Sequence, residues 1–386
     1  MVILLSALLL SPIDKRFLRS PQDKFAGTYF LAMILSSFTL FWIPYVIDTA
    51  IFSLKAAVMF FFAVIVCSTE DKFKKATWAT VSLMGVVGLL GDLQYHGINL
   101  TGGIMVYSEF KRAWQIYGIG NFDNPNDMAY SVVLVVPFTL GLLFQAKNFL
   151  TRFSALMLLA VSIYCIYLTR SRGGQLALGT CIGSWTYLWT SNKKWKKRLL
   201  VLAGFFIIVL FVSQTTGYRQ DGSAMGRIDA WSEAWTLLKA NPIIGVGKNR
   251  FTEYHAVDTH SSYVRTSVET GLIGLYGFVG LIYFSFVTVL RIDSSKDRLK
   301  WRMYSSGYGS YLISYITASI FSTRSYDMIF LLCVALIGVL GRVSLQEPDV
   351  SSAGVLFPEV HWVDKNVFGL SIGVLVVWYF FLRSVY

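Results

Sequence analysis

The sequence predicts an all-α polytopic membrane protein with about 11–12 transmembrane helices. Of its 386 residues, 55% are hydrophobic and only 15% are charged, and the mean hydropathy is +0.55. A soluble domain could not bury that much apolar surface. The polar residues are concentrated in the connections between apolar runs, and the basic ones occur in every second connection. These observations together indicate a membrane bundle with a fixed orientation.

Apolar runs long enough to cross a bilayer recur along the chain, since a helix needs about 20 residues to do so. They lie at Tyr29–Ile47, Ala50–Ser68, Ala76–Leu93, Met128–Gln145, Phe149–Leu168, Gly173–Trp189, Leu199–Val212, Ser267–Leu290, Met303–Phe321, Met328–Gly341 and Val367–Leu382. Whether the apolar residues before Ser11 form a further span stays open. No internal repeat is evident, so residues 1–386 are interpreted as one membrane domain.

Lysine and arginine set the expected orientation, because cytoplasmic connections carry an excess of both. The basic connections contain Lys15, Arg16, Arg19 and Lys24; Lys72, Lys74 and Lys75; Lys147 and Arg152; Lys193, Lys194, Lys196, Lys197 and Arg198; and Arg291, Lys296, Arg298, Lys300 and Arg302. The connections between them are therefore expected on the outer side: residues 92–127, Thr169–Arg172, residues 214–266 and Ser322–Asp327.

The outer connection at residues 214–266 is the longest polar segment, and chemistry is expected there. Within it, Gly226–Ala240 is predicted to form an amphipathic helix, because apolar residues recur at spacings of three and four. That stripe consists of Ile228, Trp231, Trp235 and Leu238. Tryptophans on such a stripe suit a helix in the headgroup zone. Asn241-Pro242 is expected to end the helix.

Four arginines on the outer side are candidate diphosphate ligands: Arg170, Arg172, Arg227 and Arg265. Guanidinium groups bind phosphate oxygens bidentately and stay charged at any relevant pH. Arg227 is expected at a helix start, where a cation opposes the helix dipole, so helix stability does not explain it. The alternative is that these arginines anchor span ends or pair with Asp229, Glu233, Asp258 and Glu269.

His260 is the candidate that would accept a proton from an attacking hydroxyl, because imidazole titrates near neutrality. It lies just before the span that closes the long outer connection. The alternative is a loop histidine that only caps or hydrogen-bonds, and His255 is a competing candidate.

Several classes of chemistry lack their motifs. The chain has no phosphate loop, no His-Glu-x-x-His zinc helix and no nucleophile elbow. No cofactor, metal site or nucleic-acid partner is therefore expected. The cysteines Cys67, Cys165, Cys181 and Cys333 lie in apolar runs and are interpreted as small buried residues.

Several motifs, in this order, resemble the bacterial O-antigen ligase and O-antigen polymerase superfamily. The motifs are Asn124-Pro125-Asn126-Asp127, Ser171-Arg172-Gly173-Gly174, Gly226-Arg227-x-x-Ala230-Trp231, Asn241-Pro242-x-x-Gly245-x-Gly247 with Phe251, and His260 followed by Glu269-x-Gly271-Leu272-x-Gly274. Family members often have asparagine directly after this histidine, whereas this chain has Ser261.

The resemblance implies a multi-span, GT-C-like glycosyltransferase in the bacterial inner membrane, with its active site facing the periplasm. Such enzymes move a glycan from undecaprenyl diphosphate to an acceptor hydroxyl, with inversion and without metal, in the biosynthesis of lipopolysaccharide or exopolysaccharide. Carried over to this chain, Arg172 and Arg227 would hold the diphosphate and His260 would activate or orient the acceptor.

The acceptor stays open. A sugar of the lipid A core would make the protein a ligase, a second lipid-linked glycan a polymerase, and a protein hydroxyl an oligosaccharyltransferase. A reading from a different class is a transporter of lipids or glycans, which usually carries ionisable residues at mid-membrane. Such residues are scarce here, and Lys55 is the clearest.

Overall fold

A computed structural model describes residues 20–108, 113–120, 122, 124–192, 194–198, 222–345 and 364–385. The chain divides into two compact units, each of which is described by itself. The first contains residues up to 69 together with residues 205–288 and 319–386, and the second contains residues 70–204 and 289–318. The expected span Leu199–Val212, the apolar start of the chain and the beginning of the long outer connection lie outside the described residues.

The described elements are helices apart from one pair of strands. The helices are α2 (Pro21–Ser37), α3 (Ile43–Val66), α4 (Glu70–Tyr95), α5 (Pro125–Val132), α6 (Val135–Gln145), α7 (Phe149–Leu168), α8 (Arg172–Trp189), α10 (Gly222–Ala240), α11 (Phe251–Tyr254), α12 (Ser262–Asp293), α13 (Arg298–Phe321), α14 (Met328–Leu345) and α15 (Lys365–Val385). The strands are β1 (Ile104–Ser108) and β2 (Ala113–Gly118). In the described ranges, six segments are long and apolar enough to cross a membrane, so the predicted all-α polytopic class is confirmed.

The first expected span, Tyr29–Ile47, is wrong. The chain turns between α2 and α3, and Phe41 takes a positive φ of 50° in that turn. The hydropathy pattern hid the break because the turn residues are themselves apolar. Their side chains point outward, and Phe41 is 83% exposed. Pro44 in the first turn of α3 fits a helix start, since its missing N–H is not needed there.

The expected span Met128–Gln145 is a broken helix made of α5 and α6. Asn124 caps α5, because its side-chain oxygen accepts a hydrogen bond from the Asp127 backbone N–H at 3.0 Å. The break follows at Val133 and Leu134, four and three residues before Pro137. A proline ring clashes with the carbonyl four residues earlier, which accounts for the interruption.

The outer connection before α5 contains an antiparallel hairpin that the sequence did not predict. Strands β1 and β2 pair from Ile104 opposite Gly118 to Tyr107 opposite Trp114. Ile116 of β2 is fully buried and packs with Met128 and Val132 of α5 and with Cys165 of α7. The hairpin is therefore fixed to the core of the second unit by one strand.

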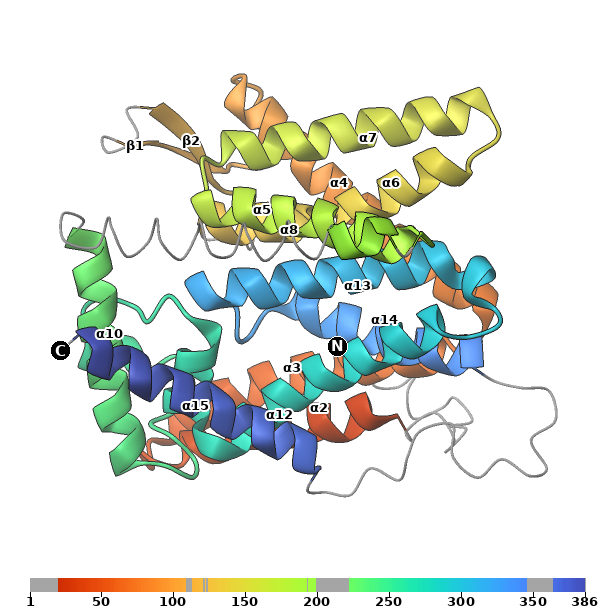
Figure 1. Ribbon diagram of the computed structural model, residues 1–386. Helices are drawn as coiled ribbons and strands as arrows, with labels where there is room; N and C mark the ends of the chain where they lie inside the picture. The colour runs from red at the N-terminus through yellow and green to blue at the C-terminus, as the bar shows by residue number, and fades with distance from the viewer. Residues whose placement is uncertain are drawn as a thin grey trace, which may run out of the picture. The chain divides into compact units, whose positions relative to one another are not determined.

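In the first unit, α2 packs against α3 and α14, and α14 also packs against α3 (Figure 1). The Gln22 side chain of α2 donates hydrogen bonds to Phe284 O at 3.2 Å and Thr288 Oγ1 at 2.9 Å, which attaches α12 to the same bundle. Asp23 of α2 forms a buried ion pair with Arg342 of α14. Two buried charges that neutralise each other hold these helices in one relative position.

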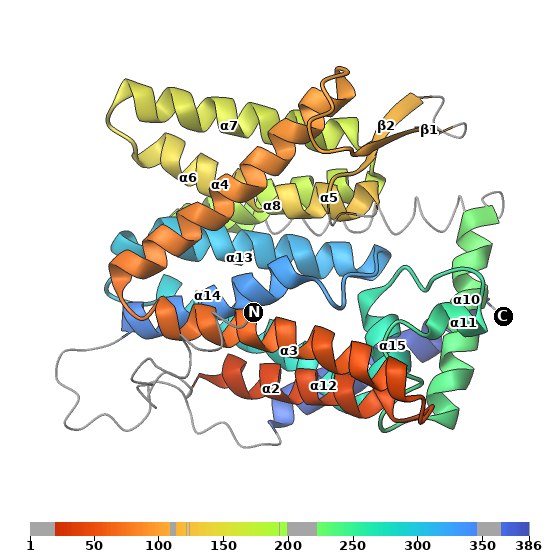
Figure 2. The ribbon, with the colours of Figure 1, turned by 180° about the vertical axis from the view of Figure 1, so that it is seen from behind.

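Helix α10 lies across the end of this bundle, beside the C-terminal part of α15 (Figures 1 and 2). Of the predicted apolar stripe, Ile228 and Leu238 are buried, and Trp231 and Trp235 are partly buried. Ala230 and Ala234, which the prediction did not include, are buried as well. Trp235 packs edge-to-face on Trp378 with ring centroids 5.0 Å apart. The two tryptophans of the stripe therefore contact α15. Such aromatic pairs contribute about 0.5–1.5 kcal/mol beyond the area that they bury.

Candidate functional site

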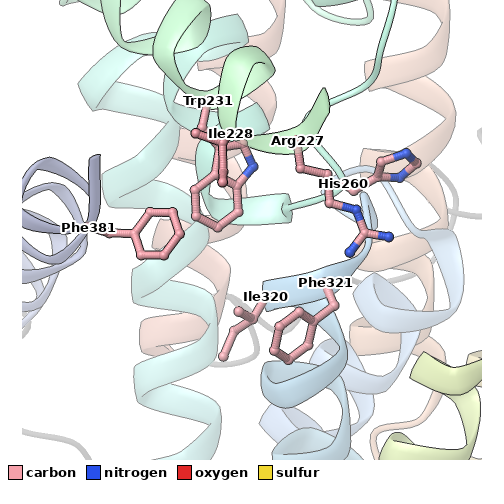
Figure 3. A pocket seen from close by; sticks show the side chains of 7 residues that line it. All are labelled: Arg227, Ile228, Trp231, His260, Ile320, Phe321 and Phe381. Carbon is pink, nitrogen blue, oxygen red and sulfur yellow. The ribbon is translucent and has the colours of Figure 1, made fainter. Parts of the chain in front are cut away.

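A pocket in the first unit contains both Arg227 and His260. Figure 3 shows their side chains next to each other on one side of the pocket, while apolar side chains occupy the other side. The apolar lining comes from three helices: Ile228 and Trp231 of α10, Ile320 and Phe321 at the end of α13, and Phe381 of α15. A cation and an imidazole thus adjoin a surface suited to hydrocarbon.

Arg227 lies in the second turn of α10, because the helix begins at Gly222 and not at the expected Gly226. Its Nε atom is buried and has no hydrogen-bond partner among the described residues. A buried donor without a partner costs about 1–3 kcal/mol, and more when it belongs to a charged group. An anion in the pocket would remove that cost.

His260 has a positive φ of 46°, an uncommon conformation for a residue with a side chain. Hydrogen bonds fix both neighbouring segments. The Trp231 indole N–H donates to Thr259 O at 2.6 Å, and Ser262 Oγ donates to Ser322 O at 2.8 Å. The backbone around His260 is therefore constrained from α10 and from the turn after α13.

Burial and the Arg227 guanidinium lower the pKa of His260 below its ordinary value, Asp258 opposes them, and Arg265 adds a smaller lowering. Both the desolvation and the neighbouring cation disfavour the imidazolium. A histidine that stays neutral at neutral pH can accept a proton. The surroundings of His260 therefore favour the neutral imidazole.

Arg265, another candidate diphosphate ligand, makes ion pairs in the same unit. Its Nε donates to Glu269 Oε1 at 2.9 Å, and its Nη1 donates to Asp258 Oδ1 at 3.0 Å. The side chain is 12% exposed. Pairing with Asp258 and Glu269 was the alternative that the sequence left open for these arginines. The structure shows this pairing for Arg265.

The glycine-rich segment after α10 pairs with the kinked part of α12. Gly271 is non-helical, with φ 65° and ψ −166°, which frees backbone groups on both sides of it. The N–H of Gly247 donates to Glu269 O at 2.9 Å, and the N–H of Leu272 donates to Pro242 O at 2.8 Å. A side chain at Gly245 would meet the Glu269 backbone at 2.5 Å, so this close approach requires glycine.

Arg170 and Arg172 lie in the second unit, between α7 and α8. Arg170 stacks over the Tyr167 ring at 4.3 Å and, like His260, has a positive φ, here 52°. Arg172 is the first residue of α8 and is exposed. Ser171 caps α8 by accepting from Gly174 N at 2.9 Å, and its hydroxyl donates to Asn126 Oδ1 at 2.5 Å. The sequence motifs around Ser171 and Asn126 therefore form one local structure.

Glu269 and Lys248 are two charged residues to which the sequence assigned no role in the site. Glu269 is fully buried, and both of its oxygens accept two hydrogen bonds each. The Lys248 ammonium lies over the Phe52 ring at 3.8 Å, and burial lowers the pKa of Lys248 to about 8. Glu269 was visible only as part of a motif, and nothing in the pattern around Lys248 indicated its burial.

Within the described ranges, no group of three or more His, Cys, Asp or Glu side chains is arranged to hold a metal ion. All four cysteines are buried, as predicted.

Residues 155–279 match a protein family model described as O-Antigen ligase. This match supports the resemblance to the O-antigen ligase and polymerase superfamily. The match covers about a third of the O-antigen ligase-like chain and contains Arg170, Arg172, Arg227, His260 and Arg265. No curated protein matches it in a sequence search. The chain is therefore a multi-pass membrane protein with a region similar to glycosyltransferases of the O-antigen ligase and polymerase type.

Proposed function

We propose that this protein transfers a glycan from an undecaprenyl diphosphate donor to an acceptor hydroxyl, at the pocket that contains Arg227 and His260. The observation that carries the proposal is the composition of that pocket. A guanidinium with a buried, unbonded Nε adjoins an imidazole of lowered pKa, and the remaining lining is apolar. A lipid-linked diphosphate has the matching parts, an anion attached to a hydrocarbon chain.

In the proposed mechanism, Arg227 binds the diphosphate and stabilises the negative charge that develops as the glycosidic bond breaks. Neutral His260 takes the proton of the acceptor hydroxyl as its oxygen attacks the anomeric carbon from the opposite face. The diphosphate leaves with the bonding electron pair. Because the acceptor oxygen attacks from the opposite face, the anomeric configuration inverts. No metal ion is required, because the cationic side chains meet the charge of the leaving group.

The sidedness of the pocket supports a reaction on the outer face of the bacterial inner membrane. The lining residues come from α10, from the segment just before α12, and from the C-terminal ends of α13 and α15. The distribution of lysine and arginine predicts that all these ends face the periplasm. The donor would then arrive already activated, since no ATP is available there.

The proposal also assigns Arg172 and Arg170 to the diphosphate, on the strength of the family resemblance. Arg265 receives a different role, because Asp258 and Glu269 already occupy its donors. The substitution Arg172→Ala tests the first assignment separately: glycan transfer near the wild-type rate would remove Arg172 from the reaction.

The central test uses purified protein in detergent with an undecaprenyl-diphosphate-linked oligosaccharide and two acceptors, lipid A core and a second lipid-linked glycan. Growth of the lipid A core product identifies a ligase, and growth of the lipid-linked chain identifies a polymerase. Transfer to neither acceptor and to no protein hydroxyl, by protein that is folded and binds the donor, would overturn the proposal.

Two substitutions separate the roles of the pocket residues. Arg227→Ala should weaken binding of undecaprenyl diphosphate, measured as a loss of ligand-induced thermal stabilisation. His260→Asn should preserve that binding and lower turnover to a small residual rate, because asparagine tolerates a positive φ but is a poor base. The matched controls are Lys239→Ala, a basic residue near the end of α10, and His255→Ala. Both should behave as wild type.

A further inference from the structure

We propose that Glu269, a residue that does not line the pocket, is a positioning residue for the reaction at His260 and acts through Arg265 and Asp258. This inference rests on the proposed function, in which His260 accepts the proton. It concerns three residues that connect α12 to the segment before His260.

Glu269 is the fixed end of this connection. Its side chain is fully buried. Oε1 accepts hydrogen bonds from Arg265 Nε at 2.9 Å and from Phe251 N at 3.2 Å, and Oε2 accepts from Asn249 N and from the Tyr326 hydroxyl, both at 2.8 Å. A buried carboxylate is tolerated only with such a complete set of partners. Glu269 therefore has no freedom to move away from Arg265.

Arg265 transmits this constraint because its guanidinium is rigid and planar. While Nε contacts Glu269, Nη1 contacts Asp258 Oδ1 at 3.0 Å, and Nη2 donates to Asn249 Oδ1 at 3.4 Å. The fork geometry of arginine fixes the distance between the two acids that it joins. A lysine, with one ammonium at the end of a flexible chain, could not hold both.

Asp258 is at the other end of this connection, two residues before His260. It accepts from Thr259 N at 2.7 Å through Oδ1, and from the Thr323 hydroxyl at 2.8 Å through Oδ2. Together with the Trp231 bond to Thr259 O, these contacts determine the backbone at residues 258 and 259. The positive φ of His260 follows directly after this segment.

A residue with a side chain at positive φ costs about 1–3 kcal/mol, and such a conformation persists where the surrounding structure over-determines it. The connection from Glu269 to Asp258 supplies that determination on the N-terminal side of His260. If it is weakened, the backbone is expected to relax toward an ordinary φ. The imidazole would then leave the position beside Arg227 that Figure 3 shows.

The test is a double-mutant cycle of Glu269→Gln with His260→Asn, measured as initial rates of glycan transfer. Glu269→Gln alone is expected to lower kcat about tenfold or more while changing the KM for the donor less than about threefold, because Arg227 is untouched. In the His260→Asn background, the same substitution should change the residual rate by less than about twofold, since its effect passes through the imidazole.

Equal losses in both backgrounds would overturn the inference, because a purely structural role lowers the amount of active protein in each. A wild-type kcat for Glu269→Gln would overturn it as well. If Glu269→Gln does not fold, Tyr326→Phe replaces it, since that change removes one hydrogen bond to Oε2 and leaves the charge in place. The expected pattern is the same, with a kcat loss of a few-fold.

The matched control is Glu253→Gln. Glu253 is also an acid paired with an arginine in this region, through Arg250 at 2.7 Å, but it has no contact with Arg265. Its kcat and KM should equal those of wild type. The failure of the proposed function differs from the failure of this inference. In the former, His260→Asn itself keeps full turnover. In the latter, His260→Asn has only its small residual rate and Glu269→Gln lowers the rate by the same factor in both backgrounds.

Discussion

Arg227 and Arg265 are both arginines close to His260, yet their surroundings are opposite. Arg227 lines a pocket with a buried donor that no described residue satisfies. Arg265 does not line this pocket, and two carboxylates accept from its guanidinium. The contrast shows that the side chain itself does not determine the role. Under the proposal, the buried unsatisfied donor suits Arg227 to bind a ligand, and the paired donors suit Arg265 to organise the site.

The largest effect on folding is expected from substitution of Arg265. Arg265→Ala should lower the free energy of unfolding by about 3–5 kcal/mol, because it leaves the fully buried Glu269 carboxylate without its cation. Thermal or denaturant unfolding in detergent measures this loss. Arg227→Ala is the comparison and should unfold as wild type or slightly later. Similar unfolding of both variants would erase the distinction between the two arginines.

The largest effect on catalysis is expected from substitution of Arg227, which lines the pocket. Arg227→Ala should lower kcat/KM about 10²–10³-fold, the usual result of removing one group that stabilises charge in the transition state. Arg227→Lys should restore only part of it, because an ammonium cannot contact two phosphate oxygens in a plane. Rates of glycan transfer at equal protein level provide the measurement. A fully active alanine variant would remove the pocket from the reaction.

Asp258 and Arg265 should shift the pH dependence of transfer in opposite directions. Burial and Arg227 lower the pKa of His260, Asp258 raises it, and Arg265 lowers it. Arg324 and Asp327, in the turn after α13, pair with each other. In the proposed mechanism neutral imidazole is the active form, so the rate falls as pH drops through this pKa. Asp258→Asn should move that acid limb to lower pH and Arg265→Gln to higher pH. Shifts of the same sign in initial-rate profiles would contradict the assignment.

Substitution of Lys248 has the smallest expected effect, and this effect concerns the stability of the same region. Burial depresses its pKa to about 8 from an ordinary 10.5, so the unfolded chain binds more protons between about pH 8 and 10.5. The ammonium therefore costs stability below pH 8, and this cost disappears as pH rises through that window. Lys248→Met should be at least as stable as wild type at pH 7, and the difference should shrink by pH 10. Unfolding midpoints at both pH values measure it.

The sequence was most informative where one physical signal dominated. Hydropathy and charge were enough to predict helices such as α7, α8 and α14 nearly at their observed bounds, because a long apolar run admits few alternatives. The spacing of Trp231, Trp235 and Leu238 predicted α10 and the side that it buries. Motif order was sufficient for the family, which the match to residues 155–279 confirms.

The sequence was uninformative where apolar residues do something other than span. The turn at Phe38–Trp42 was invisible because its residues are as apolar as those of the helices, and the hairpin β1–β2 lacks the usual turn dipeptide. Partner choice was also beyond reach. Arg227 and Arg265 were predicted as one group, since only coordinates reveal that Glu269 and Asp258 occupy the second and not the first.

The packing of α10 against α15 has a consequence for the biosynthesis of the protein. Trp231 contacts Phe381 at a ring separation of 5.3 Å, and Trp235 contacts Trp378 and Tyr379. A ribosome finishes the first partner of each pair long before the second. While the nascent chain is still being threaded into the bilayer, one wall of the pocket does not yet exist. The enzyme is therefore expected to acquire its reactivity only near the end of its biogenesis, after α15 has been inserted.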